Sequence, residues 1–440
     1  MQETAYVPIG RNAGELLEHI EDEVLTGALR PGTVLPSVRA LAAELDLSPT
    51  TVAKAYRELR RRGVVVTRDR SRTVIAHRPP LRLRLAPVVP DGTVDLATGN
   101  PDPDLLPSLE AAIRSLPTVQ HRYTDDVLLP ELLAVATDAL TEDGLDAEHL
   151  LVVGGGLDGI ERVLEVYLRL GDRVAVEDPG YPGSLDLVRT LGLEPVSVEV
   201  DDQGPVPASL EQALQGGVAA LLIVPRAQNP TGAAITSQRA AELRSLLDAY
   251  PEVLVIEDDH AAPIAQAPLV SLTRGRTRWA VVRSVAKWLG PQLRVAVLVG
   301  DEGTTTRVLA RQRLGTGWVS QLLQHVVAAT WQQARSEQTL TRVADLYDTR
   351  RRALTTALAN HGITAWGPTG LNLWIEVEEE VPVVQGLAAR GWAVAAGEAF
   401  RLRSPAGIRI TTATLAEADA PRLAADLAAV LDRHVSGRRG

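Results

Sequence analysis

The first 78 residues alternate apolar and polar positions in a way that predicts three helices followed by a hairpin. Apolar positions recur every three or four residues, the period of a helix with one buried face. They form three stripes: Leu17, Ile20, Val24 and Ala28; Val38, Leu41, Ala42 and Leu45; Val52, Ala55, Tyr56 and Leu59. Ser37 and Ser48 stand at the expected N-caps of the second and third helices. Two β-branched runs, 64–67 and 73–75, then flank a charged tip.

From residue 95 the pattern changes to short apolar runs that alternate with amphipathic stretches. Six runs are predicted to be buried strands: 150–153, 174–176, 219–224, 253–256, 280–282 and 295–299. Helical periodicity between several of them predicts an α/β domain with a mostly parallel sheet. We therefore predict a head at 1–77, a Pro- and Arg-rich linker at 78–94 and a body at 95–435, with a smaller C-terminal α+β subdomain from about 330 to 435.

Composition narrows the class of protein. The 440 residues include no cysteine, which excludes disulfides, a thiol nucleophile and a cysteine-based metal site. The N-terminus MQETAYVPIG has no apolar signal core, and no apolar run approaches the length of a membrane span. We expect a cytoplasmic protein with no membrane partner and no metal.

Charge is divided unevenly along the chain. The net charge of −10 argues against a nucleic-acid partner for the chain as a whole. Residues 47–78, however, contain nine Lys and Arg against two acidic residues, whereas residues 79–440 contain 33 basic and 45 acidic residues. A basic head on an acidic body favours binding of a polyanion, and a solvated helix face is the alternative.

Three helices followed by a hairpin form the winged type of helix-turn-helix, whose third helix enters the major groove of DNA. Hydroxyl and basic side chains on that helix can reach base edges, and arginines around it can contact phosphates. The candidate contacts to double-stranded DNA are Arg39, Ser48, Thr50, Thr51, Lys54, Arg57, Arg68, Arg70 and Arg72. A small helical domain without a ligand is the alternative.

The head also resembles the GntR family of bacterial regulators. The resemblance rests on GALRPGTVLPSVRALAAELDLSPTTVAKAYRELRRRGVV, which follows the family's second and third helices almost throughout. The chain departs from the family at the hairpin tip, where Arg68-Asp69-Arg70-Ser71-Arg72 replaces a glycine-rich turn. The resemblance therefore does not extend to the turn at the hairpin tip or to the contacts that this turn would make with a DNA groove.

The strongest chemical signal in the body is Ser284-Val285-Ala286-Lys287-Trp288-Leu289-Gly290-Pro291-Gln292-Leu293-Arg294, which follows a predicted strand. Pyridoxal 5'-phosphate (PLP) needs an amine that holds its aldehyde as a Schiff base, and fixed partners for its phosphate. Ser284 and Arg294 flank Lys287 at the spacing that fold-type I PLP enzymes use. A surface lysine is the alternative.

Five further motifs carry weight beside Lys287. Gly154-Gly155-Gly156-Leu157 lies between a strand and a helix, where backbone amides bind phosphate. Asp258, at the end of a strand, could keep a pyridine nitrogen protonated. Asn229, in Asn-Pro-Thr-Gly, could donate to a phenolic oxygen, and Tyr181 could stack on the ring. Arg409, on a predicted strand, suits capture of a carboxylate. Alone, each also fits a turn, a cap or a structural ion pair.

In order and spacing, these six motifs resemble the aminotransferase class I/II fold over about 95–435. The resemblance implies that Lys287 forms the Schiff base and that Arg409 binds the effector's carboxylate. It implies a phosphate site of Gly156, Leu157, Ser284 and Arg294, and ring contacts from Asp258, Asn229 and Tyr181. It also implies that Tyr123 reaches the phosphate of a neighbouring subunit in a homodimer. His260 departs from the family, because a tyrosine generally stands there; histidine can donate the same bond, but its charge varies near neutral pH.

A GntR-like head on an aminotransferase-like body resembles the MocR subfamily of regulators. This resemblance implies a sensor body, in which PLP or an amino compound alters the affinity for operator DNA. The short linker is similar to that of members that control vitamin B6 metabolism. Two alternatives stay open: an active aminotransferase with an accessory head, and an interaction protein with an inert cofactor domain.

Overall fold

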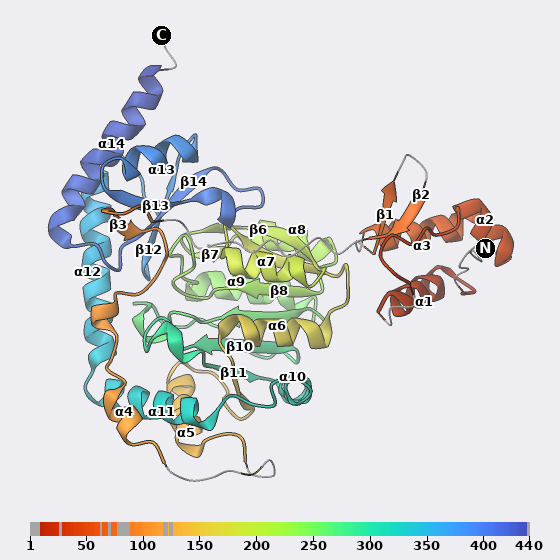
Figure 1. The fold of residues 1–440 in the computed structure, drawn as a ribbon, viewed down its shortest axis with the longest axis horizontal. Coiled ribbons are helices and arrows are strands. Elements are labelled where there is room, and N and C mark those ends of the chain that lie inside the picture. Colours follow the sequence, from red (N-terminus) through yellow and green to blue (C-terminus); the bar gives the residue numbers. More distant parts are fainter. Residues whose placement is uncertain are drawn as a thin grey trace. The chain divides into compact units, whose positions relative to one another are not determined.

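The computed structural model describes residues 9–25, 29–61, 64–68, 72–76, 89–117, 122 and 126–437. The chain divides into two compact units. The first unit contains Met1–Arg84, Leu168–Val174 and Asp186–Pro195, and the second contains Leu85–Tyr167, Ala175–Leu185 and Val196–Gly440. We call residues 1–84 the head and the rest of the chain the body, and we describe each by itself (Figure 1).

The head contains three helices around one apolar core, as predicted. They are α1 (Ala13–Leu25), α2 (Val38–Glu44) and α3 (Pro49–Arg61). Described members of all three predicted stripes form the core, with Ile20, Leu41, Val52 and Leu59 fully buried. Ala28 of the first stripe lies outside the described residues. Ser37 caps α2 by accepting a hydrogen bond from the backbone N–H of Ala40 at 3.2 Å.

Two antiparallel strands complete the head and confirm the predicted hairpin. Strands β1 (Val65–Arg68) and β2 (Arg72–Ile75) pair in a register that ends with Arg68 opposite Arg72. Val34, before α2, forms an additional antiparallel bridge to Val74. The fold of this unit is therefore a winged helix-turn-helix.

The body is built on an eight-stranded sheet of order β4-β11-β10-β9-β8-β5-β6-β7. Its strands are β4 (Leu150–Val153), β5 (Arg173–Asp178), β6 (Glu194–Asp201), β7 (Gly204–Pro205), β8 (Ala220–Ile223), β9 (Leu254–Asp258), β10 (Trp279–Ser284) and β11 (Ala296–Gly300). The six predicted strands are all present. The sheet is mostly parallel, as predicted, with β9 parallel to both β8 and β10; β11 is an exception and runs antiparallel to both β4 and β10. The β10–β11 connection is too short to hold a crossover helix, so these strands cannot be parallel.

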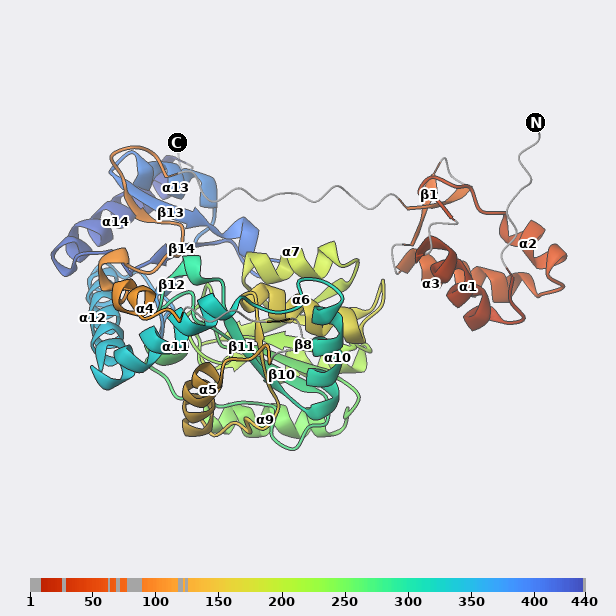
Figure 2. The ribbon, with the colours of Figure 1, turned by 60° about the horizontal axis from the view of Figure 1, so that its bottom comes forward.

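Helices cover both faces of this sheet (Figures 1 and 2). On one face, α6 (Gly156–Tyr167) packs so closely that a Cβ at Gly159 would lie 2.8 Å from Val282. On the other, α8 (Pro207–Gln215) and α9 (Ser237–Asp248) share a core with Val255 of β9. The β9–β10 register places Asp258 beside Val282 and Glu257 beside Val281. Asp258 therefore lies on the α6 face, and its two neighbours lie on the α9 face.

A smaller sheet lies in the C-terminal part, as predicted, in the order β12-β14-β13-β3. Its strands are β12 (Asn372–Glu376), β14 (Gly407–Thr411), β13 (Trp392–Ala396) and β3 (Val94–Leu96). Helices α12 (Thr339–Ala359), α13 (Glu380–Ala388) and α14 (Ala420–Gly437) pack with it. The remaining helices of the body are α4 (Glu110–Arg114), α5 (Pro130–Glu142), α7 (Pro182–Thr190), α10 (Glu302–Arg313) and α11 (Gln321–Ser336). None of the helices among the described residues is both long and apolar enough to cross a membrane.

Candidate cofactor site and DNA-binding surface

The predicted cofactor residues meet where several strands end. Asp258 is the last residue of β9, Ser284 is the last of β10, and Gly156 is the first of α6. A Cβ at Gly156 would lie 3.5 Å from the Cβ of Ser284 and 3.7 Å from Oδ1 of Asp258. Ligands in open α/β sheets bind at such carboxyl ends of strands.

The glycine turn before α6 forms a cradle with Arg294. Gly155 has a φ of +120°, and a Cβ there would lie 2.9 Å from Nη2 of Arg294. Only glycine lets the guanidinium approach this closely. Gly156 and Leu157 begin α6, whose unpaired N–H groups favour an anion. The cradle therefore has the chemistry of a phosphate site.

Lys287 lies on the β10–β11 connection and is half-buried. Its ammonium donates a hydrogen bond to the carbonyl of Gly99 at 2.5 Å. Burial, aided by the positive charge of Arg409, lowers the pKa of Lys287 to about 8, while Asp258 acts in the opposite direction. At pH 7 about one tenth of this amine is therefore unprotonated and nucleophilic, far more than for an ordinary lysine.

Asp258 is buried, and its Oδ1 has no hydrogen-bond partner among the described residues. Burial and the neighbouring charge of Asp259 raise the pKa of Asp258 to about 7, an increase that Lys287 partly offsets. An unpaired buried acceptor is costly unless a ligand satisfies it. The protonated nitrogen of a pyridine ring would do so.

Arg409 lies on β14 and is almost fully buried. Its Nη1 donates to Oδ1 of Asn229 at 3.2 Å, and its Nη2 donates to the carbonyl of Ala97. Its Nε, also buried, lacks a partner within the part of the chain that the structure describes. Burial lowers the pKa of Arg409 to about 10, which leaves it charged at neutral pH. The structure thus brings the predicted carboxylate-binding group beside the predicted phenolic-oxygen donor.

Tyr181 begins the segment that leads into α7, and 38% of it is exposed. Asp178, at the end of β5, holds this region in place. Its carboxylate accepts hydrogen bonds from the backbone N–H groups of residues 402, 403 and 404 and from the hydroxyl of Ser197. The backbone N–H of Gly180 also donates to the carbonyl of Phe400 at 2.8 Å. These contacts join the Tyr181 loop to the loop that precedes β14.

His260 follows β9 and is half-buried. Burial and the charge of Lys287 lower its pKa to about 4. The imidazole is therefore neutral at pH 7, which corrects the expectation of a variable charge and leaves it one N–H donor.

A buried ion network that was not predicted from the sequence lies behind Asp258. Asp259 accepts hydrogen bonds from Nε of Arg226 at 2.8 Å and from Nε of Arg283 at 2.8 Å. Asp143 accepts from the same two arginines, at 2.9 Å and 2.6 Å. We call these four residues the ion quartet. The acidic pair Asp258-Asp259 at the end of β9 was visible in the sequence. No regular spacing in the sequence, however, predicts that Asp259 meets Arg226 or that Asp143 lies nearby.

The backbone carbonyls of Ala97 and Gly99 were also unexpected. They belong to a loop after β3 whose sequence has no periodic pattern. A carbonyl is present at every residue, so sequence cannot single out the two that meet Lys287 and Arg409. Tyr123, the predicted contact to a neighbouring subunit, lies outside the described residues.

On the head, the predicted DNA contacts are mostly exposed. Arg39, Thr50, Lys54, Arg57 and Arg72 all face solvent. The hydroxyls of Ser48 and Thr51 lie 2.8 Å apart, and Ser48 also accepts from the backbone N–H of Thr51 at 3.1 Å, so both serve the cap of α3. The side chain of Arg68 and all of Arg70 lie outside the described residues.

Comparisons with known proteins agree with both units. Residues 91–427 match the aminotransferase class I and II family, and residues 12–75 match the gntR family of bacterial regulatory proteins. The chain is 37% identical over 433 residues to the vitamin B6 salvage pathway transcriptional repressor PtsJ of Salmonella typhimurium, covering 96% of this chain and 99% of that protein. It is 29% identical over 406 residues to the pyridoxine biosynthesis regulator PdxR of Corynebacterium glutamicum, covering 87% of each.

Aminotransferases are among the solved structures that share the fold of the body. An archaeal alanine:glyoxylate aminotransferase has a TM-score of 0.70 at 22% identity, covering 78% of this chain and 91% of that one. The α-aminoadipate aminotransferase LysN of Thermus thermophilus has a TM-score of 0.70 at 23% identity, covering 79% and 94%. At these identities the likeness shows the fold alone. The match to the aminotransferase class I and II family over residues 91–427 implies PLP binding. The chain belongs to the MocR-type transcriptional regulators, in which a GntR-family DNA-binding domain is joined to an aminotransferase class I and II domain.

Proposed function

We propose that the protein is a transcriptional regulator that binds operator DNA through its head and responds to PLP, or to an amino compound that reacts with PLP, in its body. One observation carries the cofactor assignment. Oδ1 of Asp258 is buried and unpaired among the described residues, beside the Gly156 turn. A pyridinium N–H supplies the donor that this acceptor lacks.

The chain's own residues divide the work of holding PLP. When bound, PLP supplies an aldehyde that condenses with amines and a ring that withdraws electrons. Lys287 would hold the aldehyde covalently, and Asp258 would keep the ring nitrogen protonated. Asn229 and His260 would donate to the phenolic oxygen, and Tyr181 would cover the ring. The phosphate would lie against Gly156, Leu157, Ser284 and Arg294.

Sensing would depend on the loop after β3. In the structure, the carbonyls of Ala97 and Gly99 accept hydrogen bonds from Arg409 and Lys287. A ligand that takes Nζ of Lys287 and Nη2 of Arg409 would compete with both carbonyls. Strand β3 connects this loop to the proposed linker, 78–94, which leads to the head at 1–77. We propose that release of this loop is the step that a bound ligand transmits toward the DNA-binding unit.

The remaining assignments complete the proposal. The predicted contacts on α3, the Arg39 region and the hairpin would bind double-stranded DNA. The protein would act in the cytoplasm as a homodimer in which Tyr123 of each chain reaches the partner's phosphate site. The body would span 95–435, with the small subdomain from about 330. The names of the PtsJ and PdxR relatives support a role in vitamin B6 metabolism for the regulated genes.

A DNA titration tests the proposal. The probe is the gene's own upstream region with scrambled competitor, at one fixed salt concentration, with and without PLP. We expect specific binding whose affinity changes with PLP. Lys54→Ala should weaken binding by about tenfold while leaving PLP binding intact, because Lys54 is exposed on α3. Specific binding that ignores PLP would contradict the proposed sensor.

The site residues that the structure brings together also support aminotransferase activity as a second candidate. Lys287, Asp258 and Arg409 converge as transamination would require. Turnover of an amino acid with a 2-oxoacid at ordinary enzyme rates, about 1 per second or faster, together with no specific DNA binding, would favour this candidate.

A further inference from the structure

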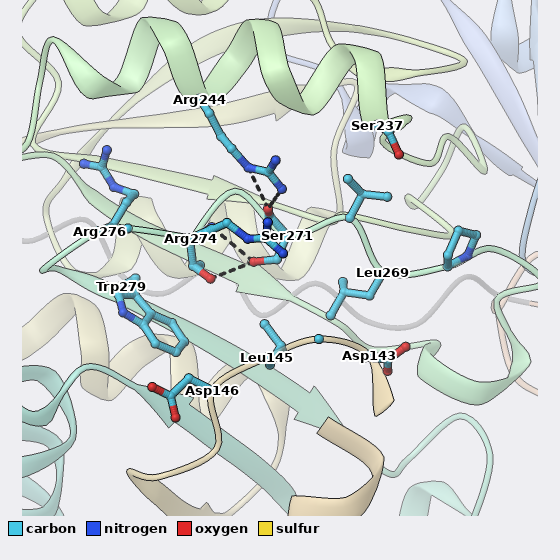
Figure 3. A pocket seen from close by; sticks show the side chains of 15 residues that line it. Asp143, Leu145, Asp146, Ser237, Arg244, Leu269, Ser271, Arg274, Arg276 and Trp279 are labelled. Carbon is cyan, nitrogen blue, oxygen red and sulfur yellow. Dashed lines mark hydrogen bonds between the residues drawn. The ribbon is translucent and has the colours of Figure 1, made fainter. Parts of the chain in front are cut away.

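A second hollow of the body lies on the α9 side of the sheet. It has a volume of 630 Å³, within the range of about 300–1,000 Å³ that is usual for small-molecule sites. Its walls come from α9, from the 143–146 loop after α5 and from the 268–276 segment before β10 (Figure 3). Among the described residues, its lining shares no member with the proposed cofactor site. We call it the arginine pocket.

Three arginines line this pocket: Arg244, Arg274 and Arg276. The first is held by the carbonyl of Ser271, which accepts from its Nε at 3.1 Å. Arg276 is held by backbone carbonyls, including that of Val253 at 2.6 Å. Arg274 is exposed and has no hydrogen-bond or ion-pair partner within the described ranges. Arg244 and Arg274 therefore bring one fixed and one free guanidinium to the pocket, whereas the guanidinium of Arg276 is turned toward the carbonyls that hold it (Figure 3).

The acidic side chains of the pocket do not cancel this charge. Asp143 belongs to the ion quartet, which is neutral because it contains two arginines and two aspartates. Asp248 and Glu252 act on the charge of Arg276. Of the lining acidic residues, this leaves Asp146 against Arg244 and Arg274. The pocket therefore favours a ligand with negative charge.

The pocket also has an apolar wall. Trp279 and Leu269 line it, with Leu145 on the opposite loop. Figure 3 shows the indole of Trp279 on the same side of the pocket as Arg276 and near Asp146. A flat apolar group could pack on the indole while its anionic end reaches an arginine.

We infer that the arginine pocket binds a small organic anion, a carboxylate or phosphate ester on a flat apolar body, at a site separate from Lys287. Ion pairs and the peptide bond between Asp258 and Asp259 connect the pocket to the cofactor site. Asp143 lines the pocket and shares Arg226 and Arg283 with Asp259, and Asp259 directly follows Asp258. An occupant is therefore placed to act as a second effector, a role that rests on the proposed function.

Calorimetric titration of the full chain, saturated with PLP, tests the binding step. Phenyl phosphate is the probe, with inorganic phosphate and phenol as its separate halves. We expect one phenyl phosphate per chain, bound at least about tenfold more tightly than either half. Arg274→Ala should weaken binding by about tenfold, because one charge-assisted contact is lost. The control is Arg278→Ala, an exposed neighbour outside the lining that donates to the carbonyl of Glu252.

Each outcome of this titration decides the assignment. Absent binding, or equal affinity in the wild type and Arg274→Ala, would overturn it. Equal affinity for phenyl phosphate and inorganic phosphate would overturn the apolar part. The titration contains no DNA, so a protein whose DNA affinity ignores PLP can still bind phenyl phosphate, and the two proposals fail separately.

The coupling has its own readout in the visible absorbance of bound PLP. Phenyl phosphate should shift this band in the wild type and in Arg278→Ala, but not in Asp143→Asn or, at the same concentration, in Arg274→Ala. Thermal unfolding checks that Asp143→Asn is folded, and Arg274→Ala supplies the test if it is not. A band that stays unchanged in wild type saturated with phenyl phosphate would contradict the coupling.

Discussion

Two carboxylates that are neighbours in sequence have opposite surroundings. Asp258, on the α6 face of the sheet, has an oxygen without a partner among the described residues, and its pKa is raised to about 7. Asp259, on the α9 face, is paired with two arginines, and they hold its pKa well below the usual range. Both are buried. The unpaired carboxylate, Asp258, is suited to bind a ligand, whereas the paired carboxylate, Asp259, stabilises the fold. Burial alone does not distinguish the two roles.

The same contrast holds for the chain's two lysines, Lys54 and Lys287. Lys54 is exposed on α3, whereas Lys287 is half-buried, and its pKa is lowered to about 8. A basic surface for a polyanion and a nucleophilic amine for an aldehyde thus use the same residue type in different surroundings. Each lysine is a matched control for the other.

The largest expected effect follows from Lys287→Ala. The variant should lose covalent PLP binding completely, because no other lysine of the body exists to hold the aldehyde. Absorbance after PLP addition, borohydride reduction and peptide mapping measure this loss. Lys54→Ala should be labelled as the wild type is. A reduced adduct at Lys54 in place of Lys287 would refute the site.

The next effect is on stability, and the two aspartates should respond in opposite ways. Asp259→Asn should lower the free energy of unfolding by about 3–5 kcal/mol, because it leaves buried arginines with too little negative charge. Asp258→Asn in the PLP-free chain should leave it unchanged or raise it by about 1 kcal/mol, since an unpaired charge is removed. Urea unfolding of both variants measures the difference. Equal destabilisation would remove the distinction drawn between them.

Asp258→Asn should also weaken PLP binding by about 30-fold, the equivalent of about 2 kcal/mol for a charge-assisted hydrogen bond. Equilibrium titration of the visible absorbance band of bound PLP measures this affinity.

The pH dependence of the free energy of unfolding is a separate test of Asp258. A folded pKa raised to about 7 means that this carboxyl's contribution to stability is full below about 4 and is lost as pH rises toward 7 and above. In the PLP-free state, the urea midpoint of the wild type should therefore fall more over this pH range than the urea midpoint of Asp258→Asn.

A smaller effect concerns the rate of PLP capture. The amine must be unprotonated to attack an aldehyde, so the rate should rise with pH and level off above a midpoint near 8. Stopped-flow absorbance across pH 6–10 measures this midpoint. A rate that keeps rising to the ordinary lysine pKa, about 10.4, would show that Lys287 is not desolvated.

The smallest effect belongs to an exposed ion pair that serves as a reference. Arg311 and Glu165 lie 3.0 Å apart, and their side chains are 42% and 29% exposed. Arg311→Ala should change the free energy of unfolding by less than about 1 kcal/mol. Arg226→Met, which removes a buried member of the ion quartet, should cost about 3 kcal/mol or more in the same urea assay. Similar values would mean that burial of the quartet adds nothing.

Much of the fold could be predicted from the sequence because local patterns determine it. The head's stripes and the six apolar runs lie within or next to the helices and strands observed. Residues of a motif with a fixed spacing, such as Ser284, Lys287 and Arg294, could also be predicted from the sequence. The antiparallel direction of β11 was not, because an apolar run has no direction until its neighbours are known.

The parts of the site that could not be predicted depend on distant contacts. Arg226 and Asp143 meet across 83 residues, and Ala97 and Arg409 across 312. No periodicity links such positions. The charge state of His260 likewise follows from burial beside Lys287, which its motif does not report.

The central claim is that DNA binding responds to PLP held at Lys287. The direct measurement is the affinity of wild type and Lys287→Ala for the upstream DNA, at one salt concentration, with and without PLP. The account predicts that the wild-type affinity changes with PLP and that the Lys287→Ala affinity does not, while both bind the DNA specifically. An equal PLP response in both proteins would contradict it.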